Sequence, residues 1–158
     1  MTVAQQIAKH FRDVHFGGNW TFVNLQDTLK DVSWEQAIEK VHSFNTIATL
    51  QYHINYYVTA IIKVLEGGPL DAKDAYSFSH QPIQSAGDWE RILAEANEAA
   101  AKLAGLIEQL PDNRLSAIFA EEKYGTVYRN LTGLIEHTHY HLGQIVLIKK
   151  ILLEQKNK

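Results

Sequence analysis

The sequence predicts an all-α fold, a four-helix bundle that forms a single domain over residues 1–158. Apolar residues recur every three or four positions in four long segments, and no segment alternates as a β-strand does. The chain has no internal repeat, and its 158 residues are the length of one ordinary domain. Local start and stop signals support each helical segment in turn.

A first helix near the N-terminus is indicated by apolar residues at helical spacing, namely Val3, Ile7, Phe11 and Val14. The pair Gly17-Gly18 interrupts this pattern before a short segment over residues 22–32. Ser33 and Gln36 have the form of a capping box, with a hydroxyl at the N-cap and an amide three residues on. A brief helix is therefore expected from this point to about residue 41.

A second long helix is expected over residues 45–66, because Gly67, Gly68 and Pro69 supply the usual stop signal. Residues 68–87 show no periodicity and are interpreted as a long loop. Structureless loops of this size are uncommon in compact domains unless they are functional or disordered. Three apolar residues indicate that this loop packs against the domain: Tyr76, Phe78 and Ile83.

Asp88 is a good N-cap for a third long helix, which Pro111 would end. The apolar face of this helix comprises Trp89, Ile92, Leu93, Ala96, Leu103, Leu106, Ile107 and Leu110. Thr126 is expected to cap a last helix that runs to about Gln155. The three tryptophans fall near helix starts and are expected to anchor packing: Trp20, Trp34 and Trp89.

The composition excludes several classes of function. With 15 basic and 18 acidic residues the net charge is −3, so neither nucleic acid nor an anionic membrane is an expected partner. No segment approaches the roughly 20 apolar residues that span a bilayer. The N-terminal residues lack a secretory core, so a cytoplasmic location is expected. Because cysteine is absent, a metal would be held by His, Asp or Glu.

Three of the eight histidines fall close together near the end of the chain: His137, His139 and His141. Residues four apart on a helix lie about 40° apart around its axis and roughly 6 Å along it, so His137 and His141 can reach one metal ion. They share the side of Leu134 and Ile145, which indicates that the pair points into the bundle. His139 lies on the opposite side and is interpreted as an exposed or interface residue.

His53 is the best candidate for a third ligand. Its face of the second long helix includes Leu50 and Tyr57, so it is expected to look inward as well. Catalytic zinc sites commonly use three protein ligands and leave a position for water. Gln144, one turn beyond His141, is a candidate to support a ligand or line the opening. Three core histidines satisfied by hydrogen bonds remain the alternative at this point.

The histidine pair is not a metalloprotease motif, because Thr138 stands where that motif needs a glutamate general base. No catalytic residue is assigned. Tyr57 is the tyrosine best placed to line a cavity, with core packing as its other use, and His80 in the long loop is not assigned to the site.

Two runs of residues surround these histidines: Tyr-His-Ile-Asn-Tyr-Tyr at 52–57 and Ile-Glu-His-Thr-His-Tyr-His-Leu-Gly-Gln-Ile at 135–145. They resemble the DinB-like superfamily of small four-helix metalloproteins. That family carries a histidine on its second helix and His-x-x-x-His on its last, followed by x-Gly-Gln-Ile. Residues 17–20 and 34–37 also look like family landmarks, so the resemblance covers nearly the whole chain.

The resemblance implies an up-down-down-up bundle, often a homodimer. It also implies a divalent ion, nickel or zinc first and iron or manganese next, on His53, His137 and His141. Similar proteins are transferases and isomerases that use a low-molecular-weight thiol such as bacillithiol, mycothiol or glutathione.

Two functions therefore stay open. The first is a metal-dependent enzyme, a thiol transferase or a hydrolase, in which the ion lowers the pKa of a bound thiol or water. Such an activity would suit detoxification or a stress response. The second is a metal-containing binding or structural bundle without catalytic activity. Open coordination positions beside a reachable pocket favour the enzyme, and a closed coordination sphere favours the structural role.

Overall fold

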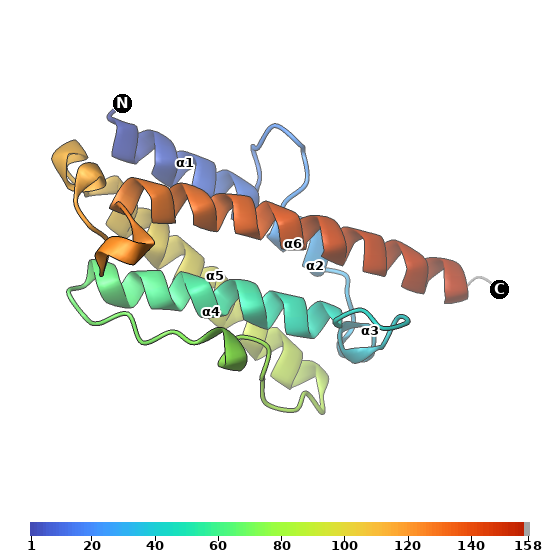
Figure 1. The fold of residues 1–158 in the computed structure, drawn as a ribbon. Helices are drawn as coiled ribbons and strands as arrows, with labels where there is room; N and C mark the ends of the chain where they lie inside the picture. Colours follow the sequence, from blue (N-terminus) through green and yellow to red (C-terminus); the bar gives the residue numbers. More distant parts are fainter. Residues whose placement is uncertain (157–158) are drawn as a thin grey trace.

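Four long helices form the protein in a computed structural model that describes residues 1–156 (Figure 1). They are α1 (Val3–Phe16), α4 (Ile47–Leu65), α5 (Ala86–Glu108) and α6 (Val127–Lys156). Two short helices, α2 (Leu25–Leu29) and α3 (Trp34–Ile38), connect α1 to α4. Single 3₁₀ turns lie in the connections on either side of α5: η1 (Asp74–Tyr76), η2 (Asp112–Ser116) and η3 (Glu122–Tyr124). The described residues contain no strand, only an isolated bridge between Ile118 and Thr126, and the predicted all-α class is confirmed.

The four long helices surround one core. α1 packs against α5 and α6, and α4 packs against the same two helices, so α1 and α4 lie diagonally opposite each other. Figure 1 shows that α1 and α6 run in one direction while α4 and α5 run in the other. Because α4 and α5 are parallel, the chain between them must return along the length of the bundle, and residues 66–85 make this return (Figure 1).

Several predicted helix ends are confirmed by hydrogen bonds. Ser33 and Gln36 form the capping box, with the Ser33 hydroxyl accepting from the Gln36 N–H at 3.3 Å and the Gln36 side chain accepting from the Ser33 N–H at 3.0 Å. The Thr126 hydroxyl accepts from the Arg129 N–H at 3.2 Å at the start of α6. At the end of α4, Gly67 has a φ of 89°, a conformation that favours glycine.

Three sequence expectations are wrong. The N-cap of α5 is Ser85, whose hydroxyl accepts from the Asp88 N–H at 3.2 Å, so Asp88 lies in the first turn and not at the cap. The brief helix after Ser33 ends at Ile38, because Glu39 already has extended backbone angles. Trp20 does not anchor packing, since 97% of its surface is exposed in the loop that follows α1. Trp89, by contrast, is buried and donates from its indole N–H to the Val32 carbonyl at 2.9 Å.

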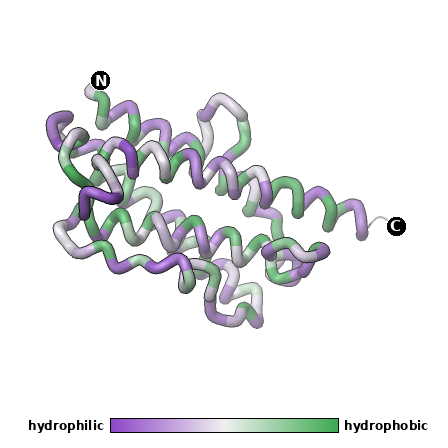
Figure 2. The backbone as a smooth tube through the Cα atoms, in the orientation of Figure 1, coloured by the Kyte–Doolittle hydropathy of each residue, from purple (hydrophilic) through white to green (hydrophobic). Residues whose placement is uncertain are grey.

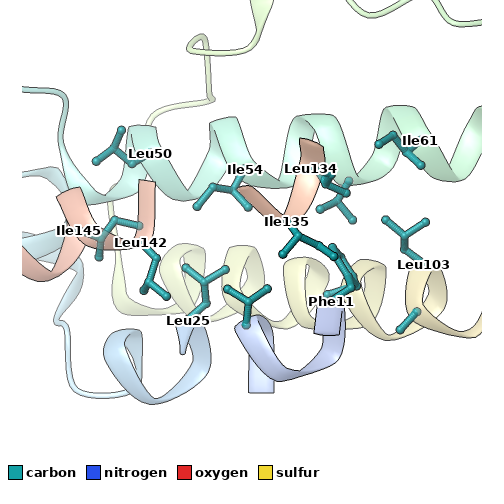
Figure 3. Close-up of a cluster of buried hydrophobic side chains, with 14 of the residues drawn as sticks. Phe11, Leu25, Leu50, Ile54, Ile61, Leu103, Leu134, Ile135, Leu142 and Ile145 are labelled. Atoms are coloured by element: carbon teal, nitrogen blue, oxygen red, sulfur yellow. The ribbon is translucent and has the colours of Figure 1, made fainter. Parts of the chain in front are cut away.

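The core lies between the four long helices, each of which is amphipathic. Figure 2 shows hydrophobic and hydrophilic residues interspersed along every long helix. Side chains from all four meet inside (Figure 3), among them Phe11 of α1, Ile54 of α4, Leu103 of α5 and Ile145 of α6, all fully buried. Every helix among residues 1–156 is too short or too polar to span a lipid bilayer.

One histidine is buried in this core away from the other candidates. His15 is 5% exposed, its ring centroid lies 4.4 Å from that of Phe11, and its buried Nε2 has no hydrogen-bond partner. Burial, together with a smaller effect of the nearby His139, lowers the pKa of His15 to about 3. The folded protein therefore keeps this ring neutral at pH values where the unfolded chain protonates it.

We expect this burial to make the protein sensitive to acid. Because the folded pKa lies below the ordinary value of 6.5, the stability contribution of a neutral His15 is complete above pH 6.5. It is lost at about 1.4 kcal/mol per pH unit as the pH falls from 6.5 toward 3. Urea unfolding at several pH values should show a shallower pH dependence for His15→Leu than for the wild type. A His42→Asn control at an exposed position should leave the slope unchanged; equal slopes for His15→Leu and wild type would contradict the prediction.

Candidate metal centre

The three histidines named from the sequence meet in the structure. His53 comes from the middle of α4, and His137 and His141 come from successive turns of α6, which packs against α4. The His53 and His137 Nε2 atoms are 2.9 Å apart, and one ring nitrogen from each of the three histidines lies within 4.8 Å of the others. His53 and His141 are buried and His137 is half-buried. A group of this kind can hold one metal ion.

The long loop fixes the orientation of His53. The His53 Nδ1 lies 2.9 Å from the hydroxyl of Ser77, which is fully buried. That hydroxyl donates its own hydrogen to the Asp74 carbonyl at 2.8 Å, so it accepts from the His53 Nδ1–H. The Nε2 of His53 is then unprotonated, and its lone pair faces the other two histidines. Phe78 stacks on the other side of the ring, with centroids 3.9 Å apart.

The two histidines of α6 differ in the hydrogen bonding of their Nδ1 atoms. The His141 Nδ1 lies 2.7 Å from the Gln144 Oε1, an acceptor, so this nitrogen carries the proton and Nε2 carries the lone pair. The Nδ1 of His137 is buried and has no partner among the described residues. Hydrogen bonds thus set His53 and His141 in the tautomer that a metal ligand needs, with the remaining nitrogen held by a neighbour.

Burial keeps the three rings neutral. Burial, together with smaller effects of His141 and His53, lowers the pKa of His137 to about 4. Burial also lowers the pKa of His53, although Asp74 opposes this shift. It lowers the pKa of His141 as well, although the hydrogen bond that His141 donates to Gln144 opposes that shift. Because a metal ligand must be unprotonated, these shifts favour metal binding at neutral pH over protonation of the rings.

Two tyrosines of α4 hold the loop that carries Ser77. The Tyr56 hydroxyl donates to the Lys73 carbonyl at 3.1 Å and accepts from the Lys73 N–H at 2.8 Å. The Tyr57 hydroxyl donates to the Asp74 carboxylate at 2.8 Å. These bonds fix η1 against α4 directly before Ser77, so Tyr56 and Tyr57 position the residue that orients His53.

A cavity of about 840 Å³ opens beside the histidines. It lies between α4, the first half of α6 and the connections on either side of α5. Its walls are mostly apolar, with Ile61, Leu70 and Phe119 among the lining residues, and all three histidines reach it. A pocket of this size and character takes a small organic molecule.

The structure also places the other residues considered in the sequence. Tyr57 lines the cavity, and Gln144 contacts His141. His139 faces α1, with its ring 6.0 Å from that of His10. His80 lies away from the cluster, with its Nε2 3.2 Å from the Thr49 hydroxyl. Sequence reasoning missed Ser77, because a serine in a segment without periodicity carries no signal of what it contacts.

We expect Ser77→Ala to weaken metal binding about 10- to 100-fold, because loss of a hydrogen bond that orients a ligand histidine typically has this effect. The substitution removes the acceptor for the His53 Nδ1–H but leaves all three imidazoles in place. A competition titration with a chromophoric chelator measures the change. Ser79→Ala, an exposed position in the same loop, should bind like the wild type; equal losses in the two variants would contradict the assigned role of Ser77.

The fold and the cluster together define a class: an all-α bundle of four long helices with three inward histidines beside an open cavity. The family model of the DinB superfamily matches residues 18–145, and the chain belongs to that superfamily. The matched range contains His53, His137 and His141. No curated protein and no solved structure gives a significant match to the chain.

Proposed function

We propose that this protein is a metal-dependent enzyme whose divalent ion, nickel or zinc, is held by His53, His137 and His141, and that it transfers a low-molecular-weight thiol to an electrophilic substrate. The observation that carries the proposal is the position of the three histidines at the wall of a large cavity. Three neutral imidazoles are a donor set that suits nickel, zinc and iron ions. Membership of the DinB superfamily is compatible with metal binding.

The protein's own groups would act by holding and orienting. Ser77 and Gln144 keep the Nε2 lone pairs of His53 and His141 toward one point. The apolar walls of the cavity exclude water from a bound substrate and strengthen the electrostatic interactions inside it. A bound divalent ion would lower the pKa of a coordinated thiol or water, so that more of this nucleophile is deprotonated at neutral pH.

The proposed reaction is a displacement at carbon that needs no external oxidant or reductant. The thiol sulfur forms a bond to an electrophilic carbon, and the bond from that carbon to its leaving group breaks with the electron pair on the leaving group. The thiol proton passes to the solvent or to the leaving group. Hydrolysis, with water in place of the thiol, is the same displacement.

Cobalt-substituted protein tests the proposal, because a thiolate bound to Co²⁺ gives a charge-transfer absorption band. We expect the band to appear with low-molecular-weight thiols, and we expect zinc- or nickel-loaded protein to release halide from an activated aryl halide in a thiol-dependent way. Loaded protein that shows neither the band nor turnover across a panel of thiols and electrophiles would contradict the enzyme. It would favour a metal-containing binding or structural bundle.

We also propose that the protein is a homodimer. Large apolar side chains are exposed along α6, with Tyr140 65% and Leu147 55% exposed, and Trp20 is almost fully exposed. Contiguous exposed apolar surface is typical of protein interfaces, and these side chains are candidates to form such a surface. Light scattering at micromolar concentration should give twice the mass of one chain, and the mass of a single chain would contradict the dimer.

A further inference from the structure

The charged groups of the cavity are separated along its length. Arg129 is the one cationic side chain among the described residues that line it. The two carboxylates of the lining lie toward the histidines: Glu136 directly precedes His137, and Asp74 contacts the Tyr57 hydroxyl and is close enough to influence the pKa of His137. One end of the cavity therefore carries the metal ligands and both carboxylates, and the other end carries a cation.

Arg129 is held in place at that end. Its Nη1 donates to the Tyr124 carbonyl at 2.9 Å. Gly125 beside it has a φ of 74°, and a Cβ at this position would come within 3.0 Å of the Arg129 Cδ. No carboxylate of the described residues forms an ion pair with Arg129. Since a guanidinium has five N–H donors, most of them stay available for an anion.

The space between the two ends is open and apolar. His137 follows Arg129 by eight positions on α6, a rise of about 12 Å along the helix. Gly133 lies midway between them in sequence, and a Cβ added there would meet nothing within 4 Å. A glycine inside a helix costs about 1 kcal/mol relative to alanine, yet at this position it leaves the cavity floor without a side chain.

We propose that the cavity binds an elongated thiol acid, with its sulfur at the three histidines, its apolar body across Gly133 and its carboxylate at Arg129. The inference rests on the proposed function for the position of the sulfur. Arg129 supplies the anion contact, Gly133 supplies room for the chain, and the spacing of about 12 Å along α6 sets the length. Arg129 is thus a residue that selects the substrate, and the reacting atoms lie at the opposite end.

A chain-length series of ω-mercaptocarboxylates tests the proposal on cobalt-loaded protein, with the matching ω-mercaptoalcohols as neutral probes. The charge-transfer band reports binding without any need for turnover. For chains of about eight carbons, which span much of the rise along α6, we expect the acid to bind about tenfold more tightly than the alcohol. For the shortest chains, whose carboxylate cannot reach Arg129, we expect no such preference.

Arg129→Gln should abolish the preference for the long-chain acid and leave the affinity for the long-chain alcohol unchanged. Arg114→Gln is the matched control, because it changes the net charge by the same amount. Arg114 is exposed on η2 and does not line the cavity. Gly133→Leu should weaken both the long acid and the long alcohol, because its side chain would enter the space they need. Circular dichroism of each variant establishes that it is folded.

The outcomes separate the two proposals. If acids and alcohols of every length bind equally, or if Arg114→Gln abolishes the preference as Arg129→Gln does, the assignment of Arg129 is overturned and the thiol enzyme stands. If no thiol produces the band in protein that holds cobalt, the proposed function fails and the thiol acid fails with it. A long-chain preference that Arg129→Gln alone removes supports both.

Discussion

Replacing His137 with alanine is expected to lower the affinity of the protein for zinc about 100- to 1000-fold. The substitution removes one of three imidazoles, and structural zinc sites with four ligands bind with roughly 10 to 16 kcal/mol, so one ligand is worth several kcal/mol. The neighbouring rings keep their hydrogen bonds to Ser77 and Gln144, so the remaining pair should stay in position. A competition titration against a chromophoric chelator measures both proteins under the same conditions.

His139→Ala is the matched control for that experiment. The residue type, the helix and the change are the same, and the position is only two residues away, but His139 faces α1 and its ring lies near that of His10. We expect its zinc affinity to equal that of the wild type. Comparable losses in His137→Ala and His139→Ala would mean that the histidine run binds zinc without the geometry described here.

Metal removal is expected to cause the second large effect, a loss of thermal stability. An ion present at about 1000 times its dissociation constant stabilises the folded state by about 4 kcal/mol. For a chain of this length that corresponds to a rise in melting temperature of roughly 8 to 16 °C. The physical reason is that the three histidines belong to α4 and α6, and the loop with Ser77 joins them through His53. Thermal melting followed by circular dichroism, with zinc and then with excess chelator, measures the shift.

The variant His137→Ala is the control for these thermal melts. His137→Ala should melt at nearly the same temperature with zinc and with chelator, because it can no longer couple binding to folding. The helical signal of the metal-free wild type at low temperature should remain, since the apolar core is formed by residues outside the cluster. An equal zinc-dependent shift in the variant would place the stabilising ion elsewhere.

The sequence was informative wherever the determining interactions are local. Helix ends depend on capping residues a few positions apart, and Ser33, Gly67 and Thr126 mark them as predicted. The relation between His137 and His141 follows from helix geometry alone, because four residues bring a side chain back to nearly the same face. His53 required one further step, the expectation that its apolar neighbours turn it toward the same core.

The unpredicted features depend on the path of a segment without periodicity. Ser77 meets His53 across 24 positions only because Tyr56 and Tyr57 hold the preceding residues on α4. Arg129 reaches the cavity because the glycine turn at 125 leaves room for its side chain. The expectation that Trp20 anchors packing rests on its position near a helix start, and it is wrong because the loop that carries Trp20 leaves its side chain in solvent.

X-ray absorption spectroscopy of zinc-loaded protein is the most direct test of the three-histidine centre. The geometry described here predicts about one zinc ion per chain with three imidazole nitrogens at roughly 2.0 to 2.1 Å, and the signal of one imidazole lost in His53→Ala. Protein that binds no zinc after reconstitution, or a spectrum with fewer than three imidazoles in the wild type, would contradict the centre and with it the proposed enzyme.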